Sequence, residues 1–241
     1  MRSNVGYRAR VSDSSTTPAP GSASQTLERG LRILEVLAGA PEGMSVTELS
    51  RALDTHRAGI YRLLRPLLDH RLVDRAGASR YRLGLGLTEL ASKVRPRLQQ
   101  VASPELQRLA DELGATVALT VREDGEAVVL LVLEPRNADL HIAYRAGLRH
   151  RIDVAAPGIA ILAANPPVQG ERPEVAETRR RGWARSSGEL LTGATGVGVA
   201  ITTGRNEPDA AISAVWISER DDEAVARTLL RTARVLSDSL R

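Results

Sequence analysis

The 241-residue chain contains no cysteine and no phenylalanine, and Lys93 is its only lysine. Without cysteine there are no disulfide bonds, no thiolate metal ligands and no cysteine nucleophile. The four histidines are scattered along the sequence, which is a poor basis for a metal site. We therefore expect neither a metal ion nor another cofactor.

Long apolar runs are also missing. No stretch approaches the roughly 18 apolar residues that span a bilayer. Residues 1–23 are rich in Ser, Thr, Pro and Gly and lack the apolar middle of a signal peptide. We therefore expect a cytoplasmic protein without a membrane partner, in which residues 1–23 form a disordered tail.

Signatures of catalysis are absent as well. The sequence has no nucleophile-elbow serine and no His-Glu-x-x-His motif. His141 and His150 lie on or beside a predicted strand, where a structural or surface role is more common than catalysis. The run from Gly193 to Gly198 resembles a nucleotide-binding loop, but it leads into a strand and lacks the Walker lysine. We expect a turn or pocket lid there, and no enzyme.

Arginine dominates what is present. Lys and Arg together number 33 against 29 Asp and Glu, for a net charge of +4. Arginine stays charged at any working pH and binds phosphate through two parallel hydrogen bonds. A GC-rich coding sequence also favours Arg over Lys and depletes Phe. The excess alone is therefore a weak indication of nucleic acid, and the placement of the arginines matters more.

The first third of the chain has the order of a DNA-binding unit. Apolar residues at helical spacing predict helices over 26–39, 46–53 and 56–70, and two alternating segments predict a hairpin over 72–83. Leu27, Leu31, Leu34 and Leu37 are expected to face the core of this unit. Ser45 and Glu48, which fit a capping box, mark the start of the second helix. The order is that of a winged helix-turn-helix, which we assign to residues 24–84.

The third helix carries the expected DNA contacts. In this motif the second of the two turn-linked helices enters the major groove, and arginine best reads guanine. Arg57 lies on the first turn, where base edges are in reach, and the arginines of the hairpin suit phosphate. For one basic helix a plain solvated face is an alternative, but the whole order of elements favours DNA. The predicted contacts are His56, Arg57, Ala58, Tyr61, Arg62, Arg65, Arg80 and Arg82.

The remainder mixes helices and strands. A linker helix is expected over 85–96 and a second domain over 97–241. In that domain the patterns predict a helix over 98–113, broken at Pro104, and an amphipathic helix over 221–240. Short helices are predicted over 158–164 and 175–181, and strands over 116–121, 127–133, 140–144, 197–202 and 210–217. We expect an α+β domain whose antiparallel sheet is covered on one face.

Several stretches, taken in order, resemble the IclR family of bacterial transcriptional regulators. They are Ser24 to Leu34, Tyr61-Arg62-Leu63-Leu64, Tyr81-Arg82-Leu83-Gly84, Pro104 to Ala110, Gly158 to Ala163 and Thr178 to Gly182. Two positions depart from that family. Ala58-Gly59 stands where a Ser-Thr pair is usual, and Ile159 stands where a lysine is usual. Gly59 should weaken its helix by about 1 kcal/mol relative to Ala.

The resemblance implies a GAF-like C-terminal domain that binds a small organic effector, and dimers that pair into tetramers. Small residues from Ala155 to Gly158 would let a ligand approach the start of a helix. A plain tight turn without a ligand explains the same residues equally well. The family pattern places Ala156, Gly158, Ser186, Ser187, Val197 and Ser213 at the pocket, with an uncertainty of about one residue across 188–196.

The sequence therefore predicts a sequence-specific DNA-binding transcriptional regulator whose affinity for a double-stranded operator is controlled by a small effector. Two alternatives stay open. One is an enzyme for small metabolites built on the C-terminal domain. The other is an interaction module with a relic helix-turn-helix.

Overall fold

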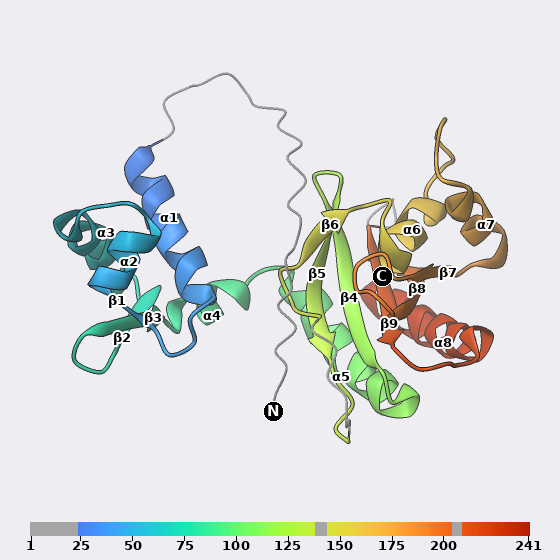
Figure 1. Cartoon of the computed structure of the whole chain (residues 1–241). Helices are drawn as coiled ribbons and strands as arrows, with labels where there is room; N and C mark the ends of the chain where they lie inside the picture. Colours follow the sequence, from blue (N-terminus) through green and yellow to red (C-terminus); the bar gives the residue numbers. More distant parts are fainter. Residues whose placement is uncertain (1–23, 138–143, 204–208) are drawn as a thin grey trace. The chain divides into compact units, whose positions relative to one another are not determined.

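The computed structural model describes residues 24–137, 144–203 and 209–241. The chain forms two compact units, one ending at Val94 and the other running from Arg95 to Arg241 (Figure 1). The expected tail over 1–23 lies outside the described residues, as do His141 and nearly all of the strand expected over 140–144. The boundary between the units falls within the expected linker helix.

The N-terminal unit contains four helices and a small antiparallel sheet of order β1-β3-β2 among the described residues. Its elements are α1 (Gln25–Ala38), β1 (Met44–Ser45), α2 (Val46–Ala52), α3 (Arg57–Asp69), β2 (Val73–Ala76), β3 (Arg80–Leu83) and α4 (Gly86–Ala91). The capping box is confirmed: the Ser45 amide donates to Glu48 Oε2 at 2.7 Å, and the Glu48 amide donates to Ser45 Oγ at 3.3 Å. The linker helix is shorter than expected, since α4 ends at Ala91.

The buried face of α1 differs from the face that the leucine spacing predicted. The buried residues of this helix are Gly30, Ile33 and Leu37, spaced by three and four residues. Leu27 and Leu31 are 63% and 51% exposed, so the prediction that they face the core is wrong. The reason is that Ile33 and Leu37 together define the stripe that packs against α3, and Leu27 and Leu31 lie beside that stripe.

The C-terminal unit is built on one six-stranded antiparallel sheet of order β6-β5-β4-β9-β8-β7. Its elements are α5 (Pro96–Leu113), β4 (Thr116–Glu123), β5 (Glu126–Leu133), β6 (Arg149–Arg151), α6 (Ala155–Ala164), α7 (Pro173–Arg181), β7 (Ala184–Ser187), β8 (Thr195–Ile201), β9 (Ala210–Trp216) and α8 (Asp222–Leu240). The long strands and the late helix match the sequence prediction. The short strands β6 and β7 were not predicted.

Helices cover both faces of this sheet, whereas the sequence predicted cover on one face. The residues of α5 and α8 pack with Leu119, Val199 and Ile212 in the largest core. Ala211, on the opposite face of β9, packs with α6. In a sheet covered on one face, apolar and polar residues alternate along each strand, whereas a strand buried on both faces is mostly apolar along its length. The first six residues of β4 are all buried, as expected for a strand covered on both faces.

Helix α5 runs without a break from Pro96 to Leu113. The expected break at Pro104 is therefore wrong. Proline removes one backbone donor from a helix, and the apolar face of α5 packed in the largest core offsets that loss. In the part of the chain that the structure describes, no helix is both long and apolar enough to cross a bilayer.

Candidate functional site

The turn between α2 and α3 is held by two side-chain hydrogen bonds. Ser50 Oγ donates to the Thr55 carbonyl at 2.6 Å, and Thr55 Oγ1 donates to the Leu53 carbonyl at 3.0 Å. The acceptors of both hydrogen bonds are backbone carbonyls of the turn. They fix the angle at which α3 leaves α2, so the exposed face of α3 is presented by a rigid support.

All six residues predicted on α3 or at its start are exposed: His56, Arg57, Ala58, Tyr61, Arg62 and Arg65. The opposite side of the helix carries the buried Ile60, Leu63 and Leu64. Arg57, Arg62 and Arg65 make no ion pair with any described residue. One face of α3 therefore presents three positive charges that the described part of the unit does not neutralise.

The N-terminus of α3 adds to this positive face. The N-cap residue is His56, and its side chain makes no capping hydrogen bond. The first amides of a helix carry a partial positive charge and point along the axis, so an uncapped start attracts anions. Arg57 stands beside these amides. The first turn of α3 is thus the most strongly anion-attracting part of the helix.

The arginines of the hairpin differ in their surroundings. Arg82 is exposed, 3.7 Å from Asp74 Oδ2. Arg75 lies over the ring of Tyr81, 5.7 Å from its centroid. Both guanidinium groups remain at the surface, where a phosphate can reach them.

Arg80 is bound within the unit. Its Nε and Nη2 atoms donate to the Gly43 carbonyl at 3.1 and 2.8 Å, and Nη2 lies 3.2 Å from Glu48 Oε2. The pKa of Glu48 is lowered, first by the amide and hydroxyl of Ser45 and then by Arg80. Arg80 therefore fastens the hairpin to the start of α2. Its contact with DNA stays a prediction, next to this role in holding the domain together.

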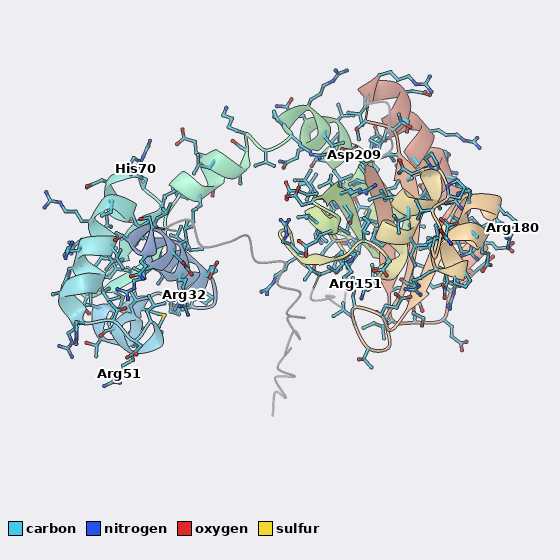
Figure 2. All side chains as sticks on the ribbon, turned by 90° about the horizontal axis from the view of Figure 1, so that it is seen from above. Arg32, Arg51, His70, Arg151, Arg180 and Asp209 are labelled. Atoms are coloured by element: carbon cyan, nitrogen blue, oxygen red, sulfur yellow. The ribbon has the colours of Figure 1, made fainter. Side chains whose placement is uncertain are left out.

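Arg51 is a further exposed arginine, outside the third helix and the hairpin, that the sequence did not predict as a DNA contact. It lies in the last turn of α2, exposed and without an ion pair to any described residue. Figure 2 shows its side chain pointing away from the unit. The buried Val46 and Leu49 of the same helix would have indicated that Arg51 faces outward. The first helix of such a motif crosses the DNA backbone, so this position suits phosphate.

A small pocket lies in the C-terminal unit at the N-terminus of α6, with a volume of about 30 Å³. Its polar lining includes Tyr144, Ser186, Glu189 and Ser213, and Leu190 and Leu191 belong to its apolar lining. Two of the six predicted pocket residues, Ser186 and Ser213, are among the lining residues. The pocket is large enough for about one water molecule.

The first amides of α6 are capped by side chains from a distant segment. The Ala155 amide donates to Glu189 Oε2 at 3.0 Å, and the Ala156 amide donates to Ser186 Oγ at 3.0 Å. Arg172 holds the same carboxylate, with Nη1 3.0 Å from Glu189 Oε2. Ala155 has φ +66°, a left-handed conformation that costs energy for a residue other than glycine. The segment 186–189 therefore stabilises a strained start of the helix.

Two buried hydroxyls face this pocket. Ser213 is fully buried, and its Oγ has no hydrogen-bond partner among the described residues. Burial raises the pKa of Tyr144 to about 12, and the nearby Thr120 hydroxyl offsets part of that rise. Tyr144 is therefore a neutral hydroxyl at physiological pH. A ligand that offers a hydrogen-bonding group would satisfy Ser213.

The other four predicted pocket residues lie elsewhere. Val197 packs in the core under α5 and α8, and Gly196 lines the pocket instead, because successive strand residues point to opposite faces. A Cβ at Gly158 would lie 2.1 Å from the Ile152 carbonyl oxygen, so this glycine permits contact with the protein's own backbone. Ser187 is exposed, and Ala156 is fully buried.

The described residues offer no obvious catalytic group at this pocket. His150, on β6, donates from Nδ1 to the Arg151 carbonyl at 2.9 Å, and burial lowers its pKa. It is not among the residues that line the pocket. Over the described ranges no three His, Asp or Glu residues come together as metal ligands.

Two regions of the chain match known domain families. Residues 26–77 match the IclR helix-turn-helix domain, and residues 92–172 match the C-terminal domain of bacterial transcriptional regulators of the IclR type. A regulator of the helix-turn-helix type from Haemophilus influenzae is 32% identical over 143 residues, which are 58% of this chain. The chain covers only 53% of that relative's length.

Solved structures show the same fold over most of the chain. The IclR protein of Thermotoga maritima superposes with a TM-score of 0.74 at 23% identity, covering 89% of this chain and 98% of the other. An IclR homologue from Microbacterium hydrocarbonoxydans, solved with 4-hydroxybenzoate, gives a TM-score of 0.76 at 23% identity, covering 90% and 99%. At such identities the likeness establishes the fold alone: a helix-turn-helix unit followed by a mixed helix and sheet domain, as in the solved IclR structures.

Proposed function

The chain belongs to the IclR family of bacterial transcriptional regulators, and on this premise we propose that it binds a specific double-stranded DNA operator through α3. The observation that carries the proposal is the exposed face of α3, with Arg57, Arg62 and Arg65 free of ion pairs to described residues. A helix in this position of the motif lies in the major groove. Such a regulator acts on chromosomal DNA and therefore in the cytoplasm.

The arginines divide into two roles. Arg57, beside the uncapped start of α3, reads a base edge, and guanine is the base that its guanidinium recognises best. Arg51, Arg75 and Arg82, exposed on α2 and the hairpin, contact phosphate and position the unit without choosing the sequence. Arg80 supports the hairpin and contributes charge to the same surface.

The test compares two arginine variants of the full chain. Arg57→Ala is expected to weaken binding to the operator by about 1–3 kcal/mol and to relax preference at one base position. Arg180→Ala is the matched control, because Arg180 is exposed on α7 and, like Arg57, makes no ion pair with a described residue. Fluorescence anisotropy against the operator and its single-base variants measures both effects.

A result in which Arg57→Ala and Arg180→Ala bind equally well, with the same base preference, would exclude Arg57 as a reader. Equal loss of affinity at every sequence would instead make Arg57 a phosphate contact. The second outcome would leave the DNA-binding function in place and move the reading residue elsewhere on α3.

We further propose that a small organic effector binds at the N-terminus of α6 and changes the affinity for DNA. Support comes from the unpartnered Ser213 hydroxyl, the neutral Tyr144 hydroxyl and the leucines that line the same pocket. The homologue solved with 4-hydroxybenzoate supports a small organic ligand for this chain. Since the pocket holds about 30 Å³, the segment 188–195 must move outward to admit an effector.

We propose no enzymatic activity for this unit. Among the described residues, Ser213 has no hydrogen-bonded base, and a serine nucleophile requires one. A purified sample that turned over small metabolites and bound no DNA sequence preferentially would favour the enzyme instead. Binding of all DNA sequences with one affinity would favour an interaction module.

A further inference from the structure

A second and larger hollow lies at one edge of the sheet in the C-terminal unit, with a volume of about 590 Å³. Strand β7 pairs with β8 only as far as Gly198. Beyond that point Val199 to Ile201 pair with β9 on one side, and no described strand pairs with them on the other. Figure 1 shows α6 and α7 on one side of this edge and α8 on the other. We call this hollow the edge groove.

Small side chains create the edge groove. Most of its apolar wall consists of alanines from α6, β8 and α8 and of Gly182, the C-cap of α7; Leu230 of α8 is the largest apolar side chain that lines it. Residues with larger side chains at these positions would fill the space between α6, α7 and α8. The small residues are Ala160, Ala163, Ala164, Gly182, Ala200 and Ala233.

Two polar atoms of α7 lack partners on this wall. Thr178 is 3% exposed, and its Oγ1 has no hydrogen-bond partner among the described residues. The Nε of Arg179 is also buried and unpartnered, although Nη1 and Nη2 bind the Glu171 carboxylate at 2.6 and 3.0 Å. Buried polar side chains nearly always have a partner. An unpartnered hydroxyl that lines a cavity therefore points to a ligand with a hydrogen-bonding group.

Positive side chains outnumber acidic ones along the described lining of the edge groove. Arg234 of α8 is exposed and makes no ion pair with any described residue. Arg241 lies 3.4 Å from Asp238, the one acidic residue among the described residues that line the groove. The charge of Arg179 is balanced by Glu171. Arg234 is thus the positive side chain left over; it directly follows Ala233 in α8 and lies one helical turn after Leu230.

We propose that the edge groove binds a small organic anion. A carboxylate lies against Arg234 and Arg241, a compact apolar body rests on the alanines, and a hydrogen-bonding group faces Thr178. The volume falls within the range of ligand sites in proteins, which is roughly 300–1,000 Å³. This site shares no lining residue with the pocket at the start of α6, so it goes beyond the proposed function and does not depend on it.

An added β-strand from another chain is the competing occupant. Three observations make it the weaker choice. Only three residues of β8 are open at this edge, which is shorter than the usual pairing length of a strand. The amide of Thr202, the next residue, already donates to Ser237 Oγ at 3.0 Å. The surrounding arginines favour an anion over a neutral peptide backbone.

The test uses 4-hydroxy-3-iodobenzoate as the probe, which carries both a carboxylate and a hydroxyl, and the full chain as the sample. Calorimetry measures its affinity for the parent, for Arg234→Gln and for the matched control Arg180→Gln, whose side chain Figure 2 shows on the outer surface of α7. Arg234→Gln is expected to weaken binding about tenfold, because it removes a charge-assisted hydrogen bond. Arg180→Gln is expected to leave it unchanged. The neutral analogue 4-hydroxy-3-iodobenzamide should bind the parent about tenfold more weakly.

A filling variant and a crystal structure locate the probe. Ala164→Leu, at an exposed position on the groove wall, should block binding while thermal melting shows an intact fold. Anomalous scattering from iodine should place the probe between α7 and α8 in the parent crystal. The proposal is overturned if iodine is found only at the start of α6 or nowhere. It is equally overturned if Arg234→Gln binds like the parent, if another chain fills the groove, or if the probe binds at crystal concentration only.

Discussion

Two serines at the pocket of the C-terminal unit have opposite hydrogen-bonding states. Ser186 Oγ accepts from the Ala156 amide at 3.0 Å, whereas Ser213 Oγ is fully buried and has no partner among the described residues. An unsatisfied buried hydroxyl reduces stability, and a satisfied one contributes to it. Removing each hydroxyl in turn therefore distinguishes a serine that supports the fold, Ser186, from a serine whose hydroxyl is left for a ligand, Ser213.

We predict that Ser213→Ala raises the free energy of unfolding of the C-terminal unit by about 1 kcal/mol, because it removes an unpaired buried hydroxyl. Ser186→Ala should lower it by about 1 kcal/mol, because the Ala156 amide loses its acceptor. Both tryptophans, Trp183 and Trp216, lie in this unit, so denaturant melts followed by tryptophan fluorescence report on it alone. A loss of stability in Ser213→Ala would mean that Ser213 already has a partner and is an ordinary core residue.

Gly59 lies in the first turn of α3, although glycine weakens a helix. A Cβ at this position would lie 2.9 Å from Thr55 Cγ2, closer than side chains tolerate. Thr55 in turn holds the turn through its hydroxyl bond to Leu53. Gly59 thus makes room for the threonine that fixes the angle between α2 and α3. The helix-weakening effect of glycine is the cost of that contact.

We predict that Gly59→Ala gains clearly less than the about 1 kcal/mol that helix propensity alone would give. The double variant Thr55→Ser with Gly59→Ala should recover that gain, because serine keeps the hydroxyl and removes the Cγ2 methyl. Hydrogen exchange of the α2 and α3 amides measures both changes in the full chain. If Gly59→Ala alone gained the full amount, the contact with Thr55 would not be limiting.

At the scale of elements, α1 and α4 each expose apolar side chains that nothing in the described unit covers. Leu27 and Leu31 lie on α1, and Leu85 and Leu90, 84% and 60% exposed, lie at the start and within the body of α4. Exposed apolar patches of this kind often mark an interface. We infer that two copies of the chain pair through these helices, which fits an operator made of two half-sites.

We predict that Leu85→Glu combined with Leu90→Glu converts the parent oligomer into monomers in light scattering at micromolar concentration. Binding to a two-site operator should weaken, because each unit then binds alone. Val168→Glu is the control, since Val168 is an equally exposed apolar residue on a loop of the C-terminal unit. An unchanged oligomer in the double variant would place the interface elsewhere, and a monomeric parent would remove the proposed dimer.

Most helices and long strands could be predicted because their signals are local. The capping box of α2, the apolar stripe of α3 and the hairpin are each formed by residues that are close together in the sequence. The exposed face of α3 followed from the same periodicity. The face of α1 could not be predicted, because Leu27 and Leu31 match helical spacing as well as Ile33 and Leu37 do.

Contacts between distant residues account for the rest. Arg80 reaches Gly43, 37 residues earlier, and the Glu189 carboxylate reaches the Ala155 amide, 34 residues earlier. No pattern of neighbouring residues in the sequence predicts contacts between residues this far apart. The sequence therefore identified Arg80 only as a basic residue and Glu189 not at all. The position of Val197 was missed for a related reason: an uncertainty of one residue in a strand reverses the face on which a side chain lies.

At the scale of the whole molecule, the two units divide the proposed work. The N-terminal unit has its own core and carries the unneutralised arginines of α3. The C-terminal unit has its own cores and holds both hollows. An effector that lowers the affinity for DNA by some factor must itself be bound less tightly by that factor when DNA is present. The coupling can therefore be measured either as the change in DNA affinity caused by the effector or as the change in effector affinity caused by DNA.

We propose that the chain chooses its DNA sequence through α3. Genome-wide recovery of the DNA that it occupies tests this most directly, with the parent and Arg57→Ala compared in cells of the source bacterium. We predict that the parent is recovered at few sites, which share a motif with two-fold symmetry, and that Arg57→Ala loses the preference at one base position in each half. Recovery of the parent at sites without any shared motif would mean that α3 does not choose the DNA sequence.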